Sequence, residues 1–125
     1  MLGTLAVAAG GAAGSLLRYW ATLLAARLGG AYFPWSTIAI NIAGSFLIGW
    51  FATATLPGGP SPASHETRLL VMTGLCGGFT TFSAFSLQTI DLARTGDWTA
   101  AAANVLLSVV LCLAAAALGH WTAAP

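Results

Sequence analysis

Four long apolar segments make up most of this chain and restrict the folds open to it. They cover residues 2–26, 36–55, 69–92 and 98–121. A helix needs about 20 mostly apolar residues to cross about 30 Å of hydrocarbon, and each segment is long enough. Only 6% of the 125 residues are charged, against about 25% in an ordinary soluble domain. We therefore expect an all-α membrane protein whose residues 1–125 form a single domain with four transmembrane helices.

Tryptophans and charges mark the ends of these segments. Trp20, Trp35, Trp98 and Trp121 lie near predicted ends, where an indole ring prefers the headgroup region. Arg18 alone is placed inside a span, and the other charged residues lie at or outside the span ends. The connections are short, and only 56–68 resembles a real loop, because its proline and glycine run at 57–62 cannot be helical.

The arginines give almost no preference for one orientation in the membrane. Arg27 and Arg94 lie on one side of the predicted bundle and Arg68 on the other, and acidic residues contribute little to orientation. Two interpretations remain open. The chain inserts both ways and pairs antiparallel with itself, or Arg18, Arg27 and Arg94 together set one orientation.

The third apolar segment contains an unusual stretch at 74–88, which combines glycines, hydroxyl side chains and phenylalanines. Each glycine of Gly77-Gly78 costs about 1 kcal/mol relative to alanine in a helix. The hydroxyls that follow can bond backbone carbonyls left without partners. The stretch therefore predicts a break in the third helix, and irregular backbone at membrane depth usually lines a cavity or an ion site.

Small residues provide close contacts between helices. Gly10 and Gly14 form a Gly-x-x-x-Gly motif in the first segment, and Gly74 and Gly78 repeat the spacing in the third. Such motifs allow backbones to approach closely. We interpret both as packing within the chain rather than as contacts between two chains.

Polar side chains form a stripe on each of two predicted helices. Their four-residue spacing places each set on one face. The second segment carries Thr37, Asn41 and Ser45, and the fourth carries Asn104, Ser108 and Cys112. Two such stripes predict either a polar path or hydrogen bonds that hold helices together, worth about 0.6 kcal/mol each.

The residues around the expected break suit a small anion. The edges of phenylalanine rings are positive, and Phe82 and Phe85 lie on one helical face. The amide of Asn41 and the hydroxyls of Thr81 and Ser83 are hydrogen-bond donors. None carries a full charge, so an anion would not be trapped. The alternative is that the phenylalanines only pack in a core.

Several functions do not fit this composition. Nucleic-acid binding needs a basic stripe, and the chain has no lysine and four arginines. His65 lies in the loop at 56–68 and His120 at the end of the fourth span. Neither can pair with a nucleophile there, so we expect no enzyme. A small multidrug-type cation exporter would need a carboxylate within the bilayer, which is missing. A non-transporting membrane scaffold remains an alternative, because the polar stripes would then only join helices.

Three motifs resemble the Fluc (CrcB-type) fluoride channels over nearly the whole chain. They are the segment 74–86, the Gly-Gly-x-x-Gly-x-x-x-Arg-Tyr run at 10–19, and the Asn-x-x-Gly-Ser-Phe-x-x-Gly run at 41–49. The resemblance implies an antiparallel dual-topology homodimer of four-span subunits in the plasma (inner) membrane. It also implies passive, selective fluoride export that lowers cytoplasmic fluoride, with a structural sodium ion at the dimer centre that is not transported.

The resemblance also implies roles for individual residues. Backbone carbonyls of Gly77 and Thr80 would hold the sodium ion, and Arg18 would lie in a vestibule that attracts anions or would extend towards the membrane surface. The residues expected along the fluoride pore are Asn41, Thr81, Phe82, Ser83, Phe85 and Ser108. Ala84, Gln88 and Cys112 differ from the residues common in the family.

Overall fold

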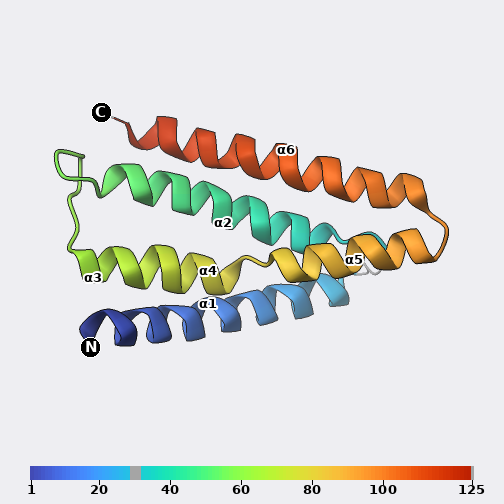
Figure 1. Ribbon diagram of the computed structural model, residues 1–125, viewed down its shortest axis with the longest axis horizontal. Coiled ribbons are helices and arrows are strands. Elements are labelled where there is room, and N and C mark those ends of the chain that lie inside the picture. Colours follow the sequence, from blue (N-terminus) through green and yellow to red (C-terminus); the bar gives the residue numbers. More distant parts are fainter. Residues whose placement is uncertain (29–31, 125) are drawn as a thin grey trace.

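The computed structural model describes residues 1–28 and 32–124, and in these ranges it is entirely helical. The elements are α1 (Leu2–Arg27), α2 (Trp35–Ala54), α3 (His65–Arg68), η1 (Leu69–Cys76), α4 (Gly77–Phe79), α5 (Phe82–Arg94) and α6 (Trp98–Ala123). Here η1 is a π-helix. The elements α3, η1, α4 and α5 follow one another along one line and together form the third helix (Figure 1). The predicted all-α class is confirmed.

Within residues 1–28 and 32–124, three helices are long and apolar enough to span a membrane. They are Trp35–Ala54, His65–Arg94 and Trp98–Ala123, so the chain is a multi-pass membrane protein. Helix α1 matches α6 in length, with 26 residues each. It is less apolar than the other three, because polar side chains such as Arg18 and Tyr19 interrupt it. That α1 forms a fourth span therefore stays a prediction.

The helices form an up-and-down bundle whose long axes run roughly together (Figure 1). The N-terminus, the end of α6 and the connection between α2 and α3 lie at one end of the molecule, and the turn between α5 and α6 lies at the other. Helix α1 packs along α3, η1 and α4, the first half of the third helix, and α2 packs along α6, which α5 also contacts. The third helix therefore lies between α1 on one side and the α2–α6 pair on the other.

Glycines bring α1 and the third helix into backbone contact. A Cβ atom on Gly10 would lie 2.1 Å from the carbonyl oxygen of Leu70, and one on Gly14 would lie 2.2 Å from that of Leu75. In return, a Cβ on Gly78 would lie 2.5 Å from the oxygen of Gly11. Both Gly-x-x-x-Gly motifs thus serve packing within the chain, as the sequence predicts.

The third helix begins earlier than the sequence suggested. The proline and glycine run at 57–62 is not helical, as expected, but α3 begins at His65 rather than at residue 69. The reason is an N-cap, because the Ser64 hydroxyl accepts a hydrogen bond from the Thr67 amide at 3.2 Å. Arg68 then donates to the Ala52 carbonyl at 3.1 Å, which ties the end of α2 to this first turn.

Candidate functional site

A cavity of about 400 Å³ lies between α2, the third helix and α6. Its lining brings together most of the residues expected at an ion site from three separate helices. These are Asn41 from α2, Gly77, Thr80, Thr81, Phe82 and Phe85 from the third helix, and Ser108 from α6. Ser45 and Cys112, from the two polar stripes, also line it. Both stripes therefore contribute to one cavity.

Two expected residues lie outside this lining. Ser83 is exposed at the start of α5, where its hydroxyl lies 3.1 Å from that of Thr81. Arg18 approaches the third helix from α1, and its Nε donates to the Gly78 carbonyl at 3.0 Å. Arg18 therefore contacts the backbone just before the break.

The predicted break lies at Thr80 and Thr81, halfway along the third helix (Figure 1). Both residues have extended backbone, with φ −80° and ψ 160° for Thr80 and φ −153° and ψ 114° for Thr81. Their hydroxyls form hydrogen bonds at the two helix ends that flank the break. The Thr80 hydroxyl donates to the Cys76 carbonyl at 2.9 Å, and the Thr81 hydroxyl accepts from the Ala84 amide at 3.1 Å as the N-cap of α5. The hydroxyls thus act on the backbone as expected.

Asn41, which lies on α2, bonds to the broken segment of the third helix. Its Oδ1 accepts from the Thr81 amide at 2.8 Å, and its Nδ2 donates to the Thr81 carbonyl at 3.1 Å. The side-chain amide thus satisfies both backbone groups of Thr81, as a neighbouring strand would. One Nδ2 hydrogen is not used in this pair, and Asn41 also lines the cavity.

Because of the break, the Thr81 and Ala84 amides do not bond to the Gly77 and Thr80 carbonyls. In an unbroken helix the Thr81 amide would bond to the Gly77 carbonyl and the Ala84 amide to the Thr80 carbonyl. Here the first amide bonds to Asn41 and the second to the Thr81 hydroxyl. The Gly77 and Thr80 carbonyls therefore keep acceptor capacity beside the cavity that both residues line. Oxygen atoms of this kind suit a hard cation such as sodium.

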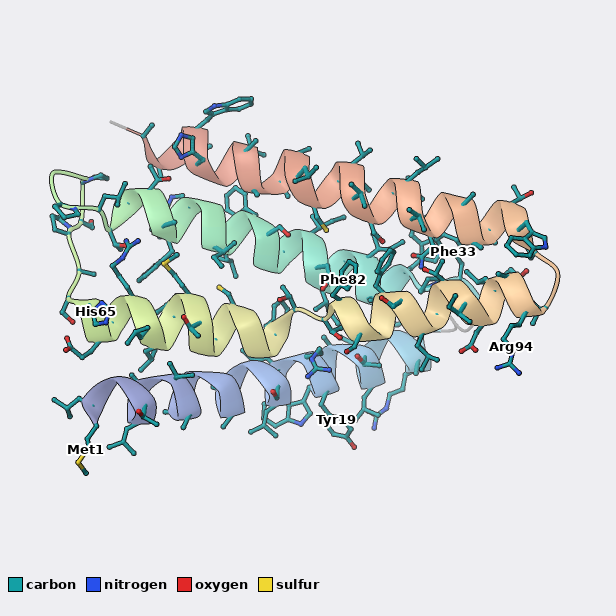
Figure 2. The ribbon with its side chains drawn as sticks, viewed as in Figure 1. Met1, Tyr19, Phe33, His65, Phe82 and Arg94 are labelled. Carbon is teal, nitrogen blue, oxygen red and sulfur yellow. The ribbon has the colours of Figure 1, made fainter. Side chains whose placement is uncertain are left out.

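Phe82 and Phe85 contact each other at the cavity wall. Their ring centres lie 5.1 Å apart, with the ring planes inclined by 49°. Phe85 is buried at 8% exposure, whereas Phe82 is 76% exposed, and its ring lies on the side of α5 away from α1 (Figure 2). An exposed ring that lines a cavity shows that the cavity opens to the outside of the single chain.

A second amide joins α6 to α5. The side chain of Asn104 is 1% exposed, and its Nδ2 donates to the Thr89 hydroxyl at 2.8 Å. The Thr89 hydroxyl donates onward to the Phe85 carbonyl at 2.8 Å, and the Ser108 hydroxyl lies 3.4 Å from Asn104 Oδ1. A hydrogen-bonded chain therefore connects the cavity residue Ser108 with the backbone of Phe85. Sequence reasoning missed Thr89, although its four-residue spacing from Phe85 was visible.

Sequence reasoning also missed a contact outside the membrane-spanning segments. The Tyr32 hydroxyl donates to one carboxylate oxygen of Asp97, and the other oxygen accepts from the Ala100 amide at 2.9 Å as the N-cap of α6. The hydrogen bond from Tyr32 lowers the pKa of Asp97 below its ordinary value of 3.8. The same bond raises the pKa of Tyr32 above 10.0. The position of Asp97 before an apolar run was a cap signal, but nothing in the sequence pointed to Tyr32.

Side-chain metal ligands do not gather in the described part of the chain. In residues 1–28 and 32–124, no three side chains of histidine, cysteine, aspartate or glutamate are close enough to hold a metal ion. A cation at this site would thus depend on backbone oxygens such as those of Gly77 and Thr80.

Several known proteins are similar in sequence to this chain. Residues 5–120 match the model of the family described as "CrcB-like protein, Camphor Resistance (CrcB)". The chain is similar to a fluoride-specific ion channel FluC of Paramagnetospirillum magneticum, at 54% identity over 91% of this chain and 89% of the relative. A FluC of Rhodospirillum rubrum is 56% identical over 91% of this chain and 88% of the relative. One of Gluconobacter oxydans is 53% identical over 95% and 83%.

Proposed function

Because the chain belongs to the CrcB family, we infer that it is a fluoride-specific ion channel, and not an enzyme, that lets fluoride cross the membrane passively. The observation that carries this inference is the cavity in which uncharged donors and two phenylalanine rings meet at a broken helix. Such a site binds an anion weakly enough to release it, as conduction requires. Passive flow out of the cell would lower cytoplasmic fluoride.

We assign the fluoride pathway to residues that line this cavity and to Ser83, whose hydroxyl lies 3.1 Å from that of Thr81. Fluoride would lose water stepwise to the free Nδ2 hydrogen of Asn41, to the hydroxyls of Thr81, Ser83 and Ser108, and to ring edges. Positive ring edges interact favourably with anions. The close contact of Phe82 and Phe85, with ring centres 5.1 Å apart, supports their acting as one unit.

We also propose that a structural sodium ion binds to the Gly77 and Thr80 carbonyls. The support is that the amides which would bond these carbonyls in an intact helix bond elsewhere. A bound sodium ion would supply positive charge that stabilises the exposed oxygens where two copies of the broken segment meet. The ion would not be transported.

The functional unit in this proposal is an antiparallel homodimer of single-domain, four-span subunits in the plasma (inner) membrane. Two observations support it. Phe82 lines the cavity but is 76% exposed in the single chain, so a second copy would close the open side. The arginines outside the spans, Arg27 and Arg94 against Arg68, favour neither orientation. Helix α1 would provide the fourth span.

The test is fluoride efflux from liposomes that contain the purified protein, recorded with a fluoride electrode and with chloride as the control anion. Wild-type protein should release fluoride and retain chloride. Phe82→Ile keeps an apolar side chain but removes the ring edge, so efflux should fall sharply. Phe51→Ile is the matched control, because Phe51 lies on α2 outside the cavity lining. Unchanged efflux in Phe82→Ile would refute the aromatic assignment, and no wild-type efflux would favour the scaffold.

A further inference from the structure

The contact between Arg18 and the third helix points to a role for this arginine beyond attracting anions. We propose that Arg18 is a positioning residue, whose Nε–H replaces the backbone donor that the break removes from Gly78. This bond holds the end of α4 in place, and with it the carbonyls beside the cavity. The proposal rests on fluoride conduction for its functional consequence, but its structural part can be tested separately.

The break leaves the carbonyls before it without their usual amide donors, and the Gly78 carbonyl accepts from a side chain instead. The Gly78 carbonyl would bond to the Phe82 amide in a continuous helix, but the chain is extended at Thr80 and Thr81. Instead it accepts from Arg18 Nε at 3.0 Å. A hydrogen bond from a charged donor is about twice as strong as one between neutral groups. Arg18 therefore holds the Gly78 carbonyl, which is next in the chain to the Gly77 carbonyl proposed to bind sodium.

The packing of α1 explains why Arg18 reaches this point. Arg18 lies one turn after Gly14, on the same face of α1. A Cβ on Gly14 would lie 2.8 Å from the Phe79 amide nitrogen and 3.1 Å from the Gly78 carbonyl carbon. Backbones this close leave no gap, so the next residue on that face meets the end of α4. The glycine contacts thus direct the guanidinium to the break.

The opposite side of the break is held in the same manner by Asn41. Asn41 bonds to both backbone groups of Thr81, at 2.8 and 3.1 Å, while Arg18 bonds to Gly78 from the other face. Two side chains from different helices thus hold the segment from Gly78 to Thr81. Because an irregular segment has few internal bonds of its own, each external bond has a large effect on its position.

Two substitutions separate the donor of Arg18 from its charge. In glutamine, Nε2 lies the same number of bonds from Cα as Nε does in arginine, so Arg18→Gln keeps a donor at that position without a charge. In lysine, a methylene occupies that position and the ammonium lies one bond further, so Arg18→Lys keeps the charge but misplaces the donor. Arg18→Met has neither a donor nor a charge.

The first readout is independent of conduction. Hydrogen–deuterium exchange of the purified protein in detergent measures protection of the segment 77–84. Arg18→Lys and Arg18→Met should exchange faster there than wild type, whereas Arg18→Gln should be better protected than both, because it keeps a donor at that position. Equal exchange in all four proteins would overturn the positioning role, even if the channel assignment holds.

The second readout is fluoride efflux per unit of folded protein, with folding checked by gel filtration and thermal unfolding. Arg18→Lys and Arg18→Met should lose about tenfold or more, as expected for the loss of a charged hydrogen bond. Arg18→Gln should keep more efflux than either of these variants, because it retains a donor at the same position, and its dependence on ionic strength should match that of wild type. High efflux in Arg18→Lys together with low efflux in Arg18→Gln would instead show that charge alone matters. A loss that only follows the amount of folded protein would also overturn the proposal.

Discussion

The two faces of the third helix are built by different means. On the face towards α1, glycines place backbone against backbone, and a Cβ on Gly10 or Gly14 would come within 2.2 Å of a carbonyl oxygen. On the face towards α2 and α6, a cavity of about 400 Å³ remains, lined by amide, hydroxyl and aromatic side chains. One face is closed by packing and the other is held open by hydrogen bonds.

This difference shows how a broken helix is stabilised inside a membrane protein. An interruption costs backbone hydrogen bonds, which lipid does not replace. The packed face holds the first half of the third helix, η1 and α4, against α1. Asn41 and the threonine hydroxyls bond to backbone groups of Cys76, Thr81 and Ala84 around the break. Side-chain size should therefore decide the outcome of substitutions on the packed face, and hydrogen-bonding capacity should decide it on the open face.

The largest effect is expected for Asn41→Asp on the open face. A carboxylate cannot donate to the Thr81 carbonyl, and its charge repels an anion in the cavity. Fluoride efflux from liposomes should be abolished. Asn41→Ala loses both bonds, and each unpaired backbone group costs about 1–3 kcal/mol, so efflux should fall. The loss should be smaller than in Asn41→Asp, because alanine adds no charge. Wild-type efflux in Asn41→Asp would remove Asn41 from the pathway.

A large effect on stability is expected for Gly10→Ala on the packed face. The new Cβ would lie 2.1 Å from the Leu70 carbonyl oxygen, so the backbones must separate, at a cost of about 1–3 kcal/mol. Gly11→Ala is the matched control, because nothing lies within 4 Å of its Cβ position. That variant should be neutral or up to about 1 kcal/mol more stable. Thermal unfolding in detergent measures both, and equal melting temperatures would contradict the packed face.

A moderate effect is expected for Thr89→Val, away from the break. This variant removes the acceptor of the buried Asn104 amide, whose bond to Thr89 is 2.8 Å long, and a lost bond of this kind costs about 0.6–1.7 kcal/mol in a membrane protein. Both helices remain intact, so efflux should fall less than in Asn41→Ala. The control is Thr122→Val, because Thr122 bonds only to carbonyls of its own helix among its described contacts. If Thr89→Val impairs efflux more than Asn41→Ala, the break is not the more sensitive region.

The sequence predicted the kind of irregularity but not its position. Gly77-Gly78 and the hydroxyls that follow indicated a broken third helix, yet the extended residues are Thr80 and Thr81. The physical reason is that Gly78 is needed for packing, since its Cβ would lie 2.5 Å from the Gly11 oxygen. Helical spacing alone could not reveal this contact between distant segments.

Candidate side chains were easier to predict than their partners. The residue types that suit an anion identified Asn41, Phe82 and Ser108, and all three line one cavity. That Asn41 bonds to the backbone of Thr81 depends on how α2 lies against the break, which no local pattern encodes. The third helix begins at His65 rather than at residue 69 for a local reason, the Ser64 cap, which was available in the sequence.

The smallest effect is expected at the Tyr32–Asp97 contact, which belongs to neither face of the third helix. Tyr32→Phe removes the hydroxyl that donates to Asp97, so the melting temperature in detergent should fall slightly while efflux stays near wild type.

The pH dependence of this effect follows from the pKa shifts of Tyr32 and Asp97. The hydrogen bond lowers the pKa of Asp97 in the folded protein, so this stabilisation is present above the unfolded pKa and is lost as the pH falls through the folded one. It also raises the pKa of Tyr32, so the contribution of the tyrosine is lost only as the pH rises through that higher value. The difference in melting temperature between wild type and Tyr32→Phe should therefore be constant between about pH 5 and pH 9. It should shrink as the pH falls below 3.8, the ordinary pKa of Asp97, and through the lower value in the folded protein. A difference that persists at lower pH would mean that the ring of Tyr32, and not its hydroxyl, stabilises the turn.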